Sequence, residues 1–246
     1  MPESAHRTIA RTFEVLDYLS DKNRPVRLKE VVQDLGYPTS SASVILKSLV
    51  MLGYASFDRA SMSYVLTPRL GALAQNVRAR TPPENPRIAA ARRRLSRLTG
   101  GTVGVGIQSD IYAQYVSVVP NRRPMPYRVR PGAVRPITRC GLGLALLSRQ
   151  SDDEIDWLRR RVNAKESDRR FHVGEAALAD EIAGVRRKGY AFSRGIFHEG
   201  IGFIGIVLPK PVNGRWAALG VGGMIPVLTE QEEIIVGELK AVAAEI

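Results

Sequence analysis

The sequence predicts an α+β protein of two domains: a small helical domain closed by a β-hairpin, then an antiparallel sheet flanked by helices. Three observations predict this class. Short amphipathic helices and a hairpin occupy residues 8–67. A helical stretch then stops at Thr81-Pro82-Pro83, as expected at a domain boundary. The rest alternates strand-like hairpins with helices, and 246 residues are enough for two cores.

Short helices joined by a turn dominate the N-terminal part. A first helix is expected from Thr8 to Leu19, and its inward side should carry the apolar residues at helical spacing: Ile9, Phe13, Leu16 and Leu19 or Tyr18. A second follows Pro25 and ends at Gly36, which suits a left-handed helix end. The turn YPTS leads to a third helix, with Thr39 or Ser40 as its expected N-cap. Its buried side is predicted to be Ala42, Ile45, Leu46, Leu49 and Leu52.

A predicted hairpin follows these helices. YASFD (54–58) and SYVLT (63–67) alternate polar and apolar residues around the turn RASM. Two helices joined by a turn and followed by a hairpin form a winged helix-turn-helix, whose later helix enters the major groove of DNA. We therefore predict a DNA-binding face from the residues outside the core and one hairpin cation: Thr39, Ser40, Ser41, Ser43, Val44, Lys47 and Arg59. Small hydroxyls suit phosphate contacts, whereas plain solvation is the alternative for such a face.

The second half is predicted from strand and helix periodicity. Strands are expected over 102–108, 111–119, 203–209 and 215–223. Helices are expected over 87–98, 139–149, 152–162 and 175–188, with a last one from Glu230, capped by Thr229. We expect a DNA-binding domain over 1–68, a linker helix over 69–83 and a second domain over 84–246. Its glycine-rich strands and the helix opening at TRCGLG could enclose a small-molecule site, although bulges also explain such glycines.

Composition argues against several classes of protein. The formal charge of +12 favours a polyanionic partner, although residues 84–246 alone hold 25 basic and 17 acidic residues. The single cysteine, Cys140, excludes a disulfide framework, and three scattered histidines leave little for a metal, so no cofactor is expected. The sequence has no run of 18 apolar residues and no signal-peptide core, which predicts a cytoplasmic protein without a membrane partner.

Catalytic motifs give an enzyme little support. GIGFIG (200–205) has the glycine spacing of a dinucleotide-binding loop, but a strand ending in proline follows it instead of a helix. His198-Glu199 is an isolated pair on a predicted loop. Cys140 at a helix start could have a lowered pKa, yet no histidine can be placed beside it from the sequence.

Several longer segments match one protein family, in the same order along the chain. TIARTFEVLDYLS, LKEVVQDLGYPTSSASVILKSLVMLGYASFD and SYVLTPRLGALA come from the N-terminal part, and PGAVRPITRCGLGLALLS and KGYAFSRGIFHEGIGFIGIVLPKPVNGRWAALGVGG from the second half. The first three resemble the winged helix of the IclR family, and the other two resemble its GAF-like effector-binding domain. The resemblance covers nearly the whole chain.

The resemblance implies where an effector would bind. It places the ligand between the helix opening and the closing strands, at Arg139, Cys140, Gly141, Leu142, Arg194, Phe203, Gly220 and Gly222. Gly220 and Gly222 stand where relatives carry polar side chains, which predicts fewer donors and more volume. Aromatic walls from Phe203, and from Tyr127 or Met125, then favour an aromatic acid. Its carboxylate could be held by Arg194 together with Arg139 or Arg135.

The resemblance also implies a function and an assembly. We predict a DNA-binding transcriptional regulator, repressor or activator, controlled by a small organic acid. Val44 stands where recognition helices of the family commonly carry an arginine. The family implies a homodimer, which could become a tetramer on DNA, formed through the N-terminal domain and the linker-helix stripe Leu70, Leu73, Ala74 and Val77. Two alternatives stay open: a ligand-binding protein whose helix-turn-helix makes protein contacts, and a weak enzyme using Cys140.

Overall fold

The chain divides into two compact units, Met1–Pro82 and Pro83–Ile246, each with its own hydrophobic core. The computed structural model describes residues 7–80, 86–121, 129–212 and 214–245, and for residues 76–80 it describes the backbone alone. No helix in these ranges has the length and apolar run that a bilayer crossing requires.

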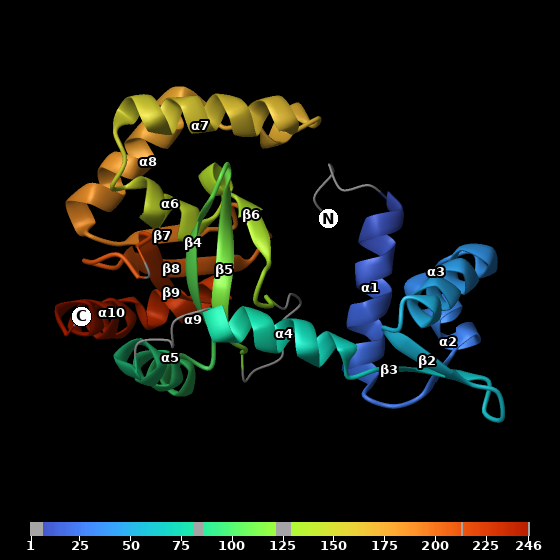
Figure 1. Ribbon diagram of the computed structural model, residues 1–246. Coiled ribbons are helices and arrows are strands. Elements are labelled where there is room, and N and C mark those ends of the chain that lie inside the picture. Colours follow the sequence, from blue (N-terminus) through green and yellow to red (C-terminus); the bar gives the residue numbers. More distant parts are fainter. Residues whose placement is uncertain (1–6, 81–85, 122–128, 213, 246) are drawn as a thin grey trace. The chain divides into compact units, whose positions relative to one another are not determined.

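The N-terminal unit is a winged helix-turn-helix, which confirms the predicted fold (Figure 1). Its elements are α1 Arg7–Lys22, β1 Val26–Arg27, α2 Leu28–Leu35, α3 Thr39–Met51, β2 Ala55–Asp58, β3 Ser63–Leu66 and α4 Arg69–Arg80. The hairpin pairs Ala55 with Leu66 and Asp58 with Ser63, and β1 adds to the other edge of β3. A small antiparallel sheet therefore closes the helical core.

The turn before α2 is fixed by a carboxylate. Glu30 in the first turn of α2 accepts hydrogen bonds from the Arg24 guanidinium, at 2.5 and 3.3 Å, and from the backbone N–H of Arg27 at 2.9 Å. The Arg24 bonds first, and the Arg27 amide second, lower the pKa of Glu30 to about 2. At the other end, Gly36 has φ +67°, so the predicted left-handed helix end is confirmed.

Some details of the predicted helical core were wrong. Val15 and Leu19 are the buried residues of α1, whereas Ile9 and Phe13 are 56% and 64% exposed. Spacing alone cannot tell two apolar stripes on one helix apart, and here the second stripe faces outward.

The predicted ends of α3 also need correction. Thr39 is the first residue of the helix, so Pro38 occupies the N-cap position and no side chain caps this end. Leu52 lies beyond the last helical residue and is exposed, because the chain turns there into Gly53 at φ +76°. The predicted core residues Ala42, Ile45, Leu46 and Leu49 are all buried.

The C-terminal unit is a six-stranded antiparallel sheet between two layers of helices, in strand order β6-β5-β4-β9-β8-β7. Its strands are β4 Thr102–Ser109, β5 Tyr112–Val119, β6 Val134–Pro136, β7 Ala191–Arg194, β8 Ile201–Val207 and β9 Ala217–Met224. Its helices are α5 Pro86–Thr99, α6 Gly141–Leu147, α7 Asp152–Lys165, α8 Glu175–Lys188, α9 Ile225–Glu230 and α10 Glu232–Ala244. Single 3₁₀ turns cover Ile137–Arg139 and Arg169–Phe171.

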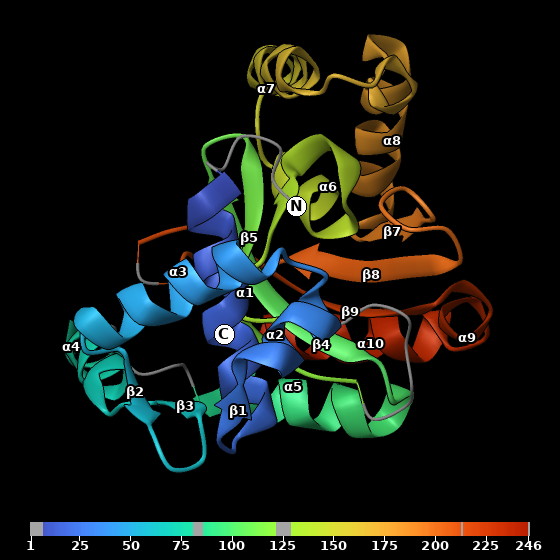
Figure 2. The same ribbon diagram turned by 90° about the vertical axis from the view of Figure 1, so that its right-hand side faces the viewer.

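Each face of the sheet has its own core. Helices α6, α7 and α8 cover one face, and α5, α9 and α10 cover the other (Figures 1 and 2). Side chains alternate between the faces along a strand, so on β8 Phe203 points toward α6 while Ile204 joins the opposite core. This explains why the predicted strands are apolar at nearly every position.

The end of the chain differs from the prediction. Two helices replace the single one, because Pro226 starts α9 and α10 begins afresh at Glu232. Thr229 lies inside α9 and is not a cap. Glu232 instead accepts a hydrogen bond of 2.6 Å from the Tyr190 hydroxyl. The short edge strands β6 and β7 were not predicted.

Candidate functional site

The outer face of α3 consists of the residues that do not pack into the core of the N-terminal unit. Thr39, Ser40, Val44 and Lys47 are exposed, with Ser41 and Ser43 half-buried beside them. Val44 is 63% exposed, so an apolar side chain stands in water at the centre of this face. An exposed aliphatic group among small hydroxyls suits contact with a thymine methyl group in the major groove.

The hairpin turn that carries Arg59 is held rigidly. The Asp58 carboxylate accepts hydrogen bonds from the backbone N–H groups of Ala60 and Ser61, at 3.0 and 3.3 Å, and from the Ser61 hydroxyl at 2.5 Å. The Arg27 guanidinium donates to the Ser61 carbonyl at 3.2 Å and so ties the turn to β1. The three hydrogen bonds that Asp58 accepts, with that of the Ser61 hydroxyl first, lower the pKa of its carboxyl group. Arg59 is therefore presented on an ordered turn.

A cavity of about 70 Å³ lies in the C-terminal unit between the sheet and the start of α6. It is lined by residues of all six strands, the start of α6 with its N-cap, the β5–β6 connection and the β7–β8 loop: Thr102, Tyr115, Val129, Arg135, Cys140, Gly141, Ser193, Phe197, His198, Ile201, Gly202, Phe203 and Gly222. Four of the eight predicted effector residues, Cys140, Gly141, Phe203 and Gly222, are among them. The site is small; buried groups form its inner wall, and the exposed Phe197 and His198 lie at its open side.

One row of cross-strand partners forms the sheet wall of this cavity. Ser193 pairs with Phe203, Phe203 with Gly222, and Gly222 with Thr102, so the row crosses four strands on one face. The next row on the same face is Ala191, Gly205, Gly220 and Gly104. Since this second row has almost no side chains, the ring of Phe203 lies over it: a β-carbon on Gly205 or Gly220 would overlap the ring.

Helix α6 approaches the sheet closely because glycines remove the side chains between them. A β-carbon on Gly143 would overlap the carbonyl of Ile137, and one on Gly106 would overlap the side chain of Leu142. A β-carbon on Gly141 would lie 2.6 Å from the Ser193 hydroxyl oxygen and 2.8 Å from the Phe203 ring. These distances are shorter than real β-carbon contacts. The cavity exists only in this tightly packed arrangement.

A cation and two hydroxyls face the cavity. The Arg135 guanidinium stacks over the Phe197 ring at 4.2 Å and donates to the carbonyl of Val134 at 2.6 Å. Ser193 and Tyr115 are almost fully buried, and within the described ranges the structure records no hydrogen bond to either hydroxyl. Burial lowers the pKa of Arg135 and raises that of Tyr115, the directions expected when charged forms lose water.

Cys140 is a structural thiol. It is buried, it is the N-cap of α6, and its sulfur accepts a hydrogen bond of 3.3 Å from the backbone N–H of Gly143. Burial outweighs this bond and raises the pKa of the thiol to about 11. The thiolate is the nucleophilic form, so the raised pKa runs against the alternative of a lowered one and favours the structural thiol over an enzyme using Cys140.

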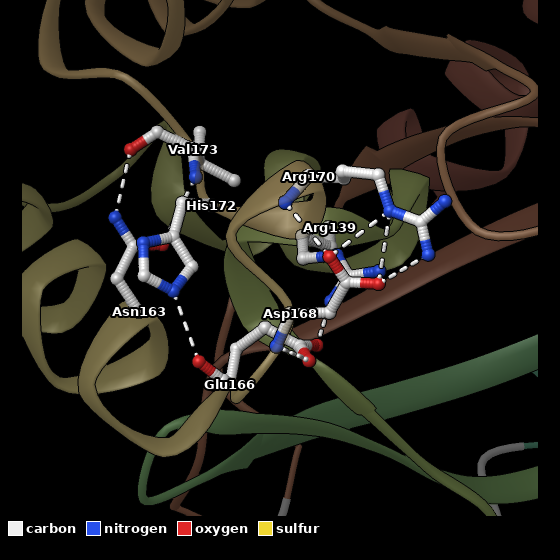
Figure 3. A network of polar contacts seen from close by, with 7 residues as sticks. All are labelled: Arg139, Asn163, Glu166, Asp168, Arg170, His172 and Val173. Carbon is white, nitrogen blue, oxygen red and sulfur yellow. Dashed lines mark hydrogen bonds and ion pairs between the residues drawn. The ribbon is translucent and has the colours of Figure 1, made fainter.

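Arg139 lies outside the cavity and holds another part of the fold together. Its guanidinium forms an ion pair of 2.5 Å with Glu166 and stacks over the Phe171 ring at 4.5 Å, with its side chain only 11% exposed. Figure 3 shows this pair within a network that also contains Asp168, Arg170 and His172. The 3₁₀ turn before α6 is thereby fixed to the connection between α7 and α8.

Three further predicted residues are also placed differently from expectation. Arg194 stacks over the Phe192 ring at 3.5 Å and pairs with Glu232 at 3.5 Å, away from the cavity. Leu142 packs on Gly106, and Gly220 lies beneath the Phe203 ring, so neither lines the cavity. The glycines therefore do not enlarge the site as expected, because an aromatic ring fills the space that they leave. Tyr127 and Met125 lie outside the described residues.

A second hollow is larger, but exposed side chains form much of its lining. It measures about 410 Å³ and lies at the end of α6, against the exposed residues Arg149, Arg215 and Trp216. The Arg149 guanidinium stacks over the Trp216 ring at 3.7 Å. Exposed groups of this kind are satisfied by water, whereas the smaller cavity brings a cation together with the hydroxyl-bearing, nearly buried residues Ser193 and Tyr115. The smaller cavity is the better candidate for an effector site.

The comparisons with known proteins identify the family. The IclR helix-turn-helix domain matches residues 8–59, and the domain described as the bacterial transcriptional regulator IclR C-terminal matches residues 87–246. The chain belongs to the IclR family. It is 22% identical over 244 residues to the acetate operon repressor of Salmonella typhimurium, covering 97% of this chain and 88% of that protein.

Solved IclR structures share the fold over the whole chain. The Thermotoga maritima IclR superposes with a TM-score of 0.68 at 18% identity, covering 97% of this chain and 98% of that one. An IclR regulator from Alicyclobacillus acidocaldarius has a TM-score of 0.62 at 23% identity, covering 98% and 97%. The family is one of transcriptional regulators and not of enzymes, so this IclR-family member is a transcriptional regulator with a helix-turn-helix domain.

Sequence reasoning missed several residues of the cavity in this IclR-family fold. Thr102, Tyr115 and Ser193 line it, but they come from three strands that meet only through sheet pairing. The available signal was the alternation of TVGVGIQ and IYAQYVSVV, which places Thr102 and Tyr115 on definite strand faces. No group of three or more His, Cys, Asp or Glu suited to a metal occurs in the described ranges.

The close approach of α6 predicts a sharp difference between two glycines of this regulator. Gly143→Ala should destabilise the C-terminal unit by about 1–3 kcal/mol, because the new methyl group meets backbone. Gly237→Ala in α10 meets no atom within 4 Å and should stabilise by roughly 0.5–1 kcal/mol. Both tryptophans, Trp157 and Trp216, lie in this unit, so denaturant unfolding followed by tryptophan fluorescence measures it. Equal midpoints for the two variants would contradict the contact.

Proposed function

We propose that this IclR-family regulator binds operator DNA through α3 and the hairpin turn, and that a small organic acid in the cavity controls it. One observation carries the effector proposal: the Arg135 guanidinium converges on one enclosed space with the hydroxyls of Ser193 and Tyr115, for which the described residues offer no hydrogen-bond partner. A carboxylate supplies the charge that an arginine binds and the acceptors that hydroxyls need. A second oxygen on the ligand would satisfy the remaining hydroxyl.

The DNA-binding proposal rests on the face of α3 and on Arg59. Thr39, Ser40, Ser41 and Ser43 offer hydroxyls near the start of the helix, where phosphate oxygens are bound favourably. Val44 would contact base edges, and Lys47 and Arg59 would contact phosphates. Because this face carries few cations, electrostatic attraction to phosphates should contribute modestly to the binding free energy. Specificity should therefore depend more on shape and apolar contact.

We also propose a domain division and an assembly. Residues 1–68 bind DNA, residues 69–83 link the domains, and residues 84–246 bind the effector. The exposed Ile9 and Phe13 on α1, with Leu73 on α4, support a homodimer through the N-terminal part, because such apolar surface is costly in water. Two dimers could form a tetramer on DNA. A symmetric dimer reads two half-sites, which a single winged helix cannot do.

The direction of regulation depends on the operator position. Relatives are named as repressors, among them the acetate operon repressor of Salmonella typhimurium and the transcriptional repressor IclR of Escherichia coli. Repression is therefore the mode that we propose first, and activation uses the same architecture from a different site on DNA. The regulator would act in the cytoplasm, where its operator DNA lies.

Removing a phosphate-binding cation should change the salt dependence of operator binding. Lys47→Ala and Arg59→Ala should each flatten the slope of log affinity against log salt by about 1. Val44→Ala should change which sequences are preferred and leave the slope unchanged. Lys188→Ala, an exposed cation on α8, is the control. Selection from random DNA and binding titrations at several salt concentrations measure both effects. Unaltered affinity and preference in all the α3 variants would exclude α3 as the reading helix.

A charge on the exposed stripe of α1 should weaken dimerisation. Phe13→Asp should shift the protein toward monomer, because the dimer would bury an uncompensated carboxylate. Met51→Asp is the control, since Met51 is 87% exposed on α3 and lies outside the proposed contact. Analytical ultracentrifugation at micromolar concentration distinguishes the two variants. A Phe13→Asp protein that stays as dimeric as the wild type would contradict this interface.

Two arginines should differ in their effect on acid binding. Arg135→Gln should weaken binding of the acid roughly 10–100-fold, because a charge-assisted hydrogen bond contributes about 1.5–3 kcal/mol. Arg194→Gln should leave affinity unchanged, since Arg194 pairs with Glu232 on the surface. Calorimetry with a panel of short aliphatic and aromatic acids measures both. Loss of binding in Arg194→Gln alone would place the acid elsewhere.

A further inference from the structure

The cavity is bounded on one side by a single aromatic ring. Phe203 is 7% exposed and lies at the middle of β8, where its ring covers the glycine row beneath it. Gly205, Gly220 and Gly141 each approach the ring so closely that a β-carbon would overlap it or lie within 2.9 Å of it. Three glycines from three different elements therefore form a recess that this ring fills.

The volume of the cavity decides which ligands fit beside the ring. An engineered cavity of about 150 Å³ is known to hold one benzene molecule. The present cavity of about 70 Å³ is roughly half of that size, which leaves space for only a few non-hydrogen atoms. A carboxylate with a short chain fits such a space, whereas an aromatic ring would extend beyond it.

The Phe203 ring is confined on the sides that face the sheet backbone and α6. Backbone lies beneath it at Gly205 and Gly220, and α6 lies beside it at Gly141. The open space next to the ring is the cavity itself. Rotation of the side chain would therefore fill the site instead of enlarging it, and interiors at normal packing density do not yield by the width of a ring.

We propose that Phe203 determines effector specificity by size, restricting the site to short-chain organic acids and excluding aromatic ones. The proposal rests on the proposed function, since it concerns the same cavity and the same acid. The Phe203 ring occupies space that the apolar part of a larger ligand would otherwise fill. Arg135, Ser193 and Tyr115 bind the polar end of the acid, and Phe203 limits the length and width of its carbon chain.

The test removes the ring and measures which ligands the site accepts. Wild-type protein and Phe203→Ala are titrated by calorimetry with two- to four-carbon carboxylates and with benzoate. Wild type should bind short acids and give no detectable binding of benzoate, whereas Phe203→Ala should bind benzoate at least ten-fold more tightly than wild type. Equal benzoate affinity in the two proteins would overturn the proposal.

A matched control separates size selection from general loss of stability. Phe192 is also 7% exposed and stands on the neighbouring strand β7, but its side chain belongs to the core on the opposite face. Phe192→Ala should lose comparable stability and gain no benzoate binding. Benzoate binding gained equally in both variants would show a nonspecific effect and overturn the proposal.

Benzene separates the size limit from the identity of the effector. Benzene should raise the melting temperature of Phe203→Ala and not that of wild type, whether or not the natural effector is an acid. If benzene stabilises Phe203→Ala but neither protein binds a carboxylate, the proposed size limit stands and the proposed organic-acid effector is refuted. Absence of both benzene and benzoate effects in Phe203→Ala would refute the size limit. If Phe203→Ala does not fold, Phe203→Leu should extend the accepted chain length, and an unchanged limit would contradict the proposal.

Discussion

The contact between the start of α6 and the sheet determines the geometry of the effector domain. It is a contact with backbone: Gly143 faces the Ile137 carbonyl, Gly106 receives the Leu142 side chain, and Gly141 touches Ser193 and Phe203. Each position excludes even a methyl group. The cavity wall is therefore set by main-chain positions, which vary less than side-chain rotamers do. Residues from strands far apart in the sequence converge because the helix lies this close.

The same absence of β-carbons serves a second purpose within the sheet. The glycine row beneath Phe203 continues to Gly104, where a β-carbon would lie 2.7 Å from the Tyr115 ring. Two aromatic rings thus lie on bare backbone, and both residues line the cavity. Glycines in strands weaken a sheet by themselves, and here the buried rings offset that loss.

The elements that depend on local chemistry could be predicted from the sequence. The hairpin around RASM, the helix end at Gly36 and the buried side of α3 follow from spacing and turn residues. The site could be predicted only in part, because three arginines look equivalent in sequence while their partners do not. Glu166 lies 27 residues after Arg139 and Glu232 lies 38 residues after Arg194, and only folding brings these pairs together. A similar long-range pair joins Arg161 to Asp110, and the net charge of +12 is the excess of cations over such possible partners.

The segment before α6 connects these features. Cys140 and Gly141 line the cavity, while the adjacent Arg139 is fixed by Glu166 to the α7–α8 connection. Asp168 strengthens this connection by binding Arg170, and those hydrogen bonds lower its pKa to about 2. On the helix side the cavity wall is therefore held by an ion pair, and on the sheet side the Phe203 ring is supported by the glycine row beneath it. Discrimination by size requires this rigidity, because a wall that yields by one methylene group no longer rejects the larger ligand. A small cavity in a flexible domain would discriminate weakly between ligands of different size. The same volume between rigid walls discriminates strongly.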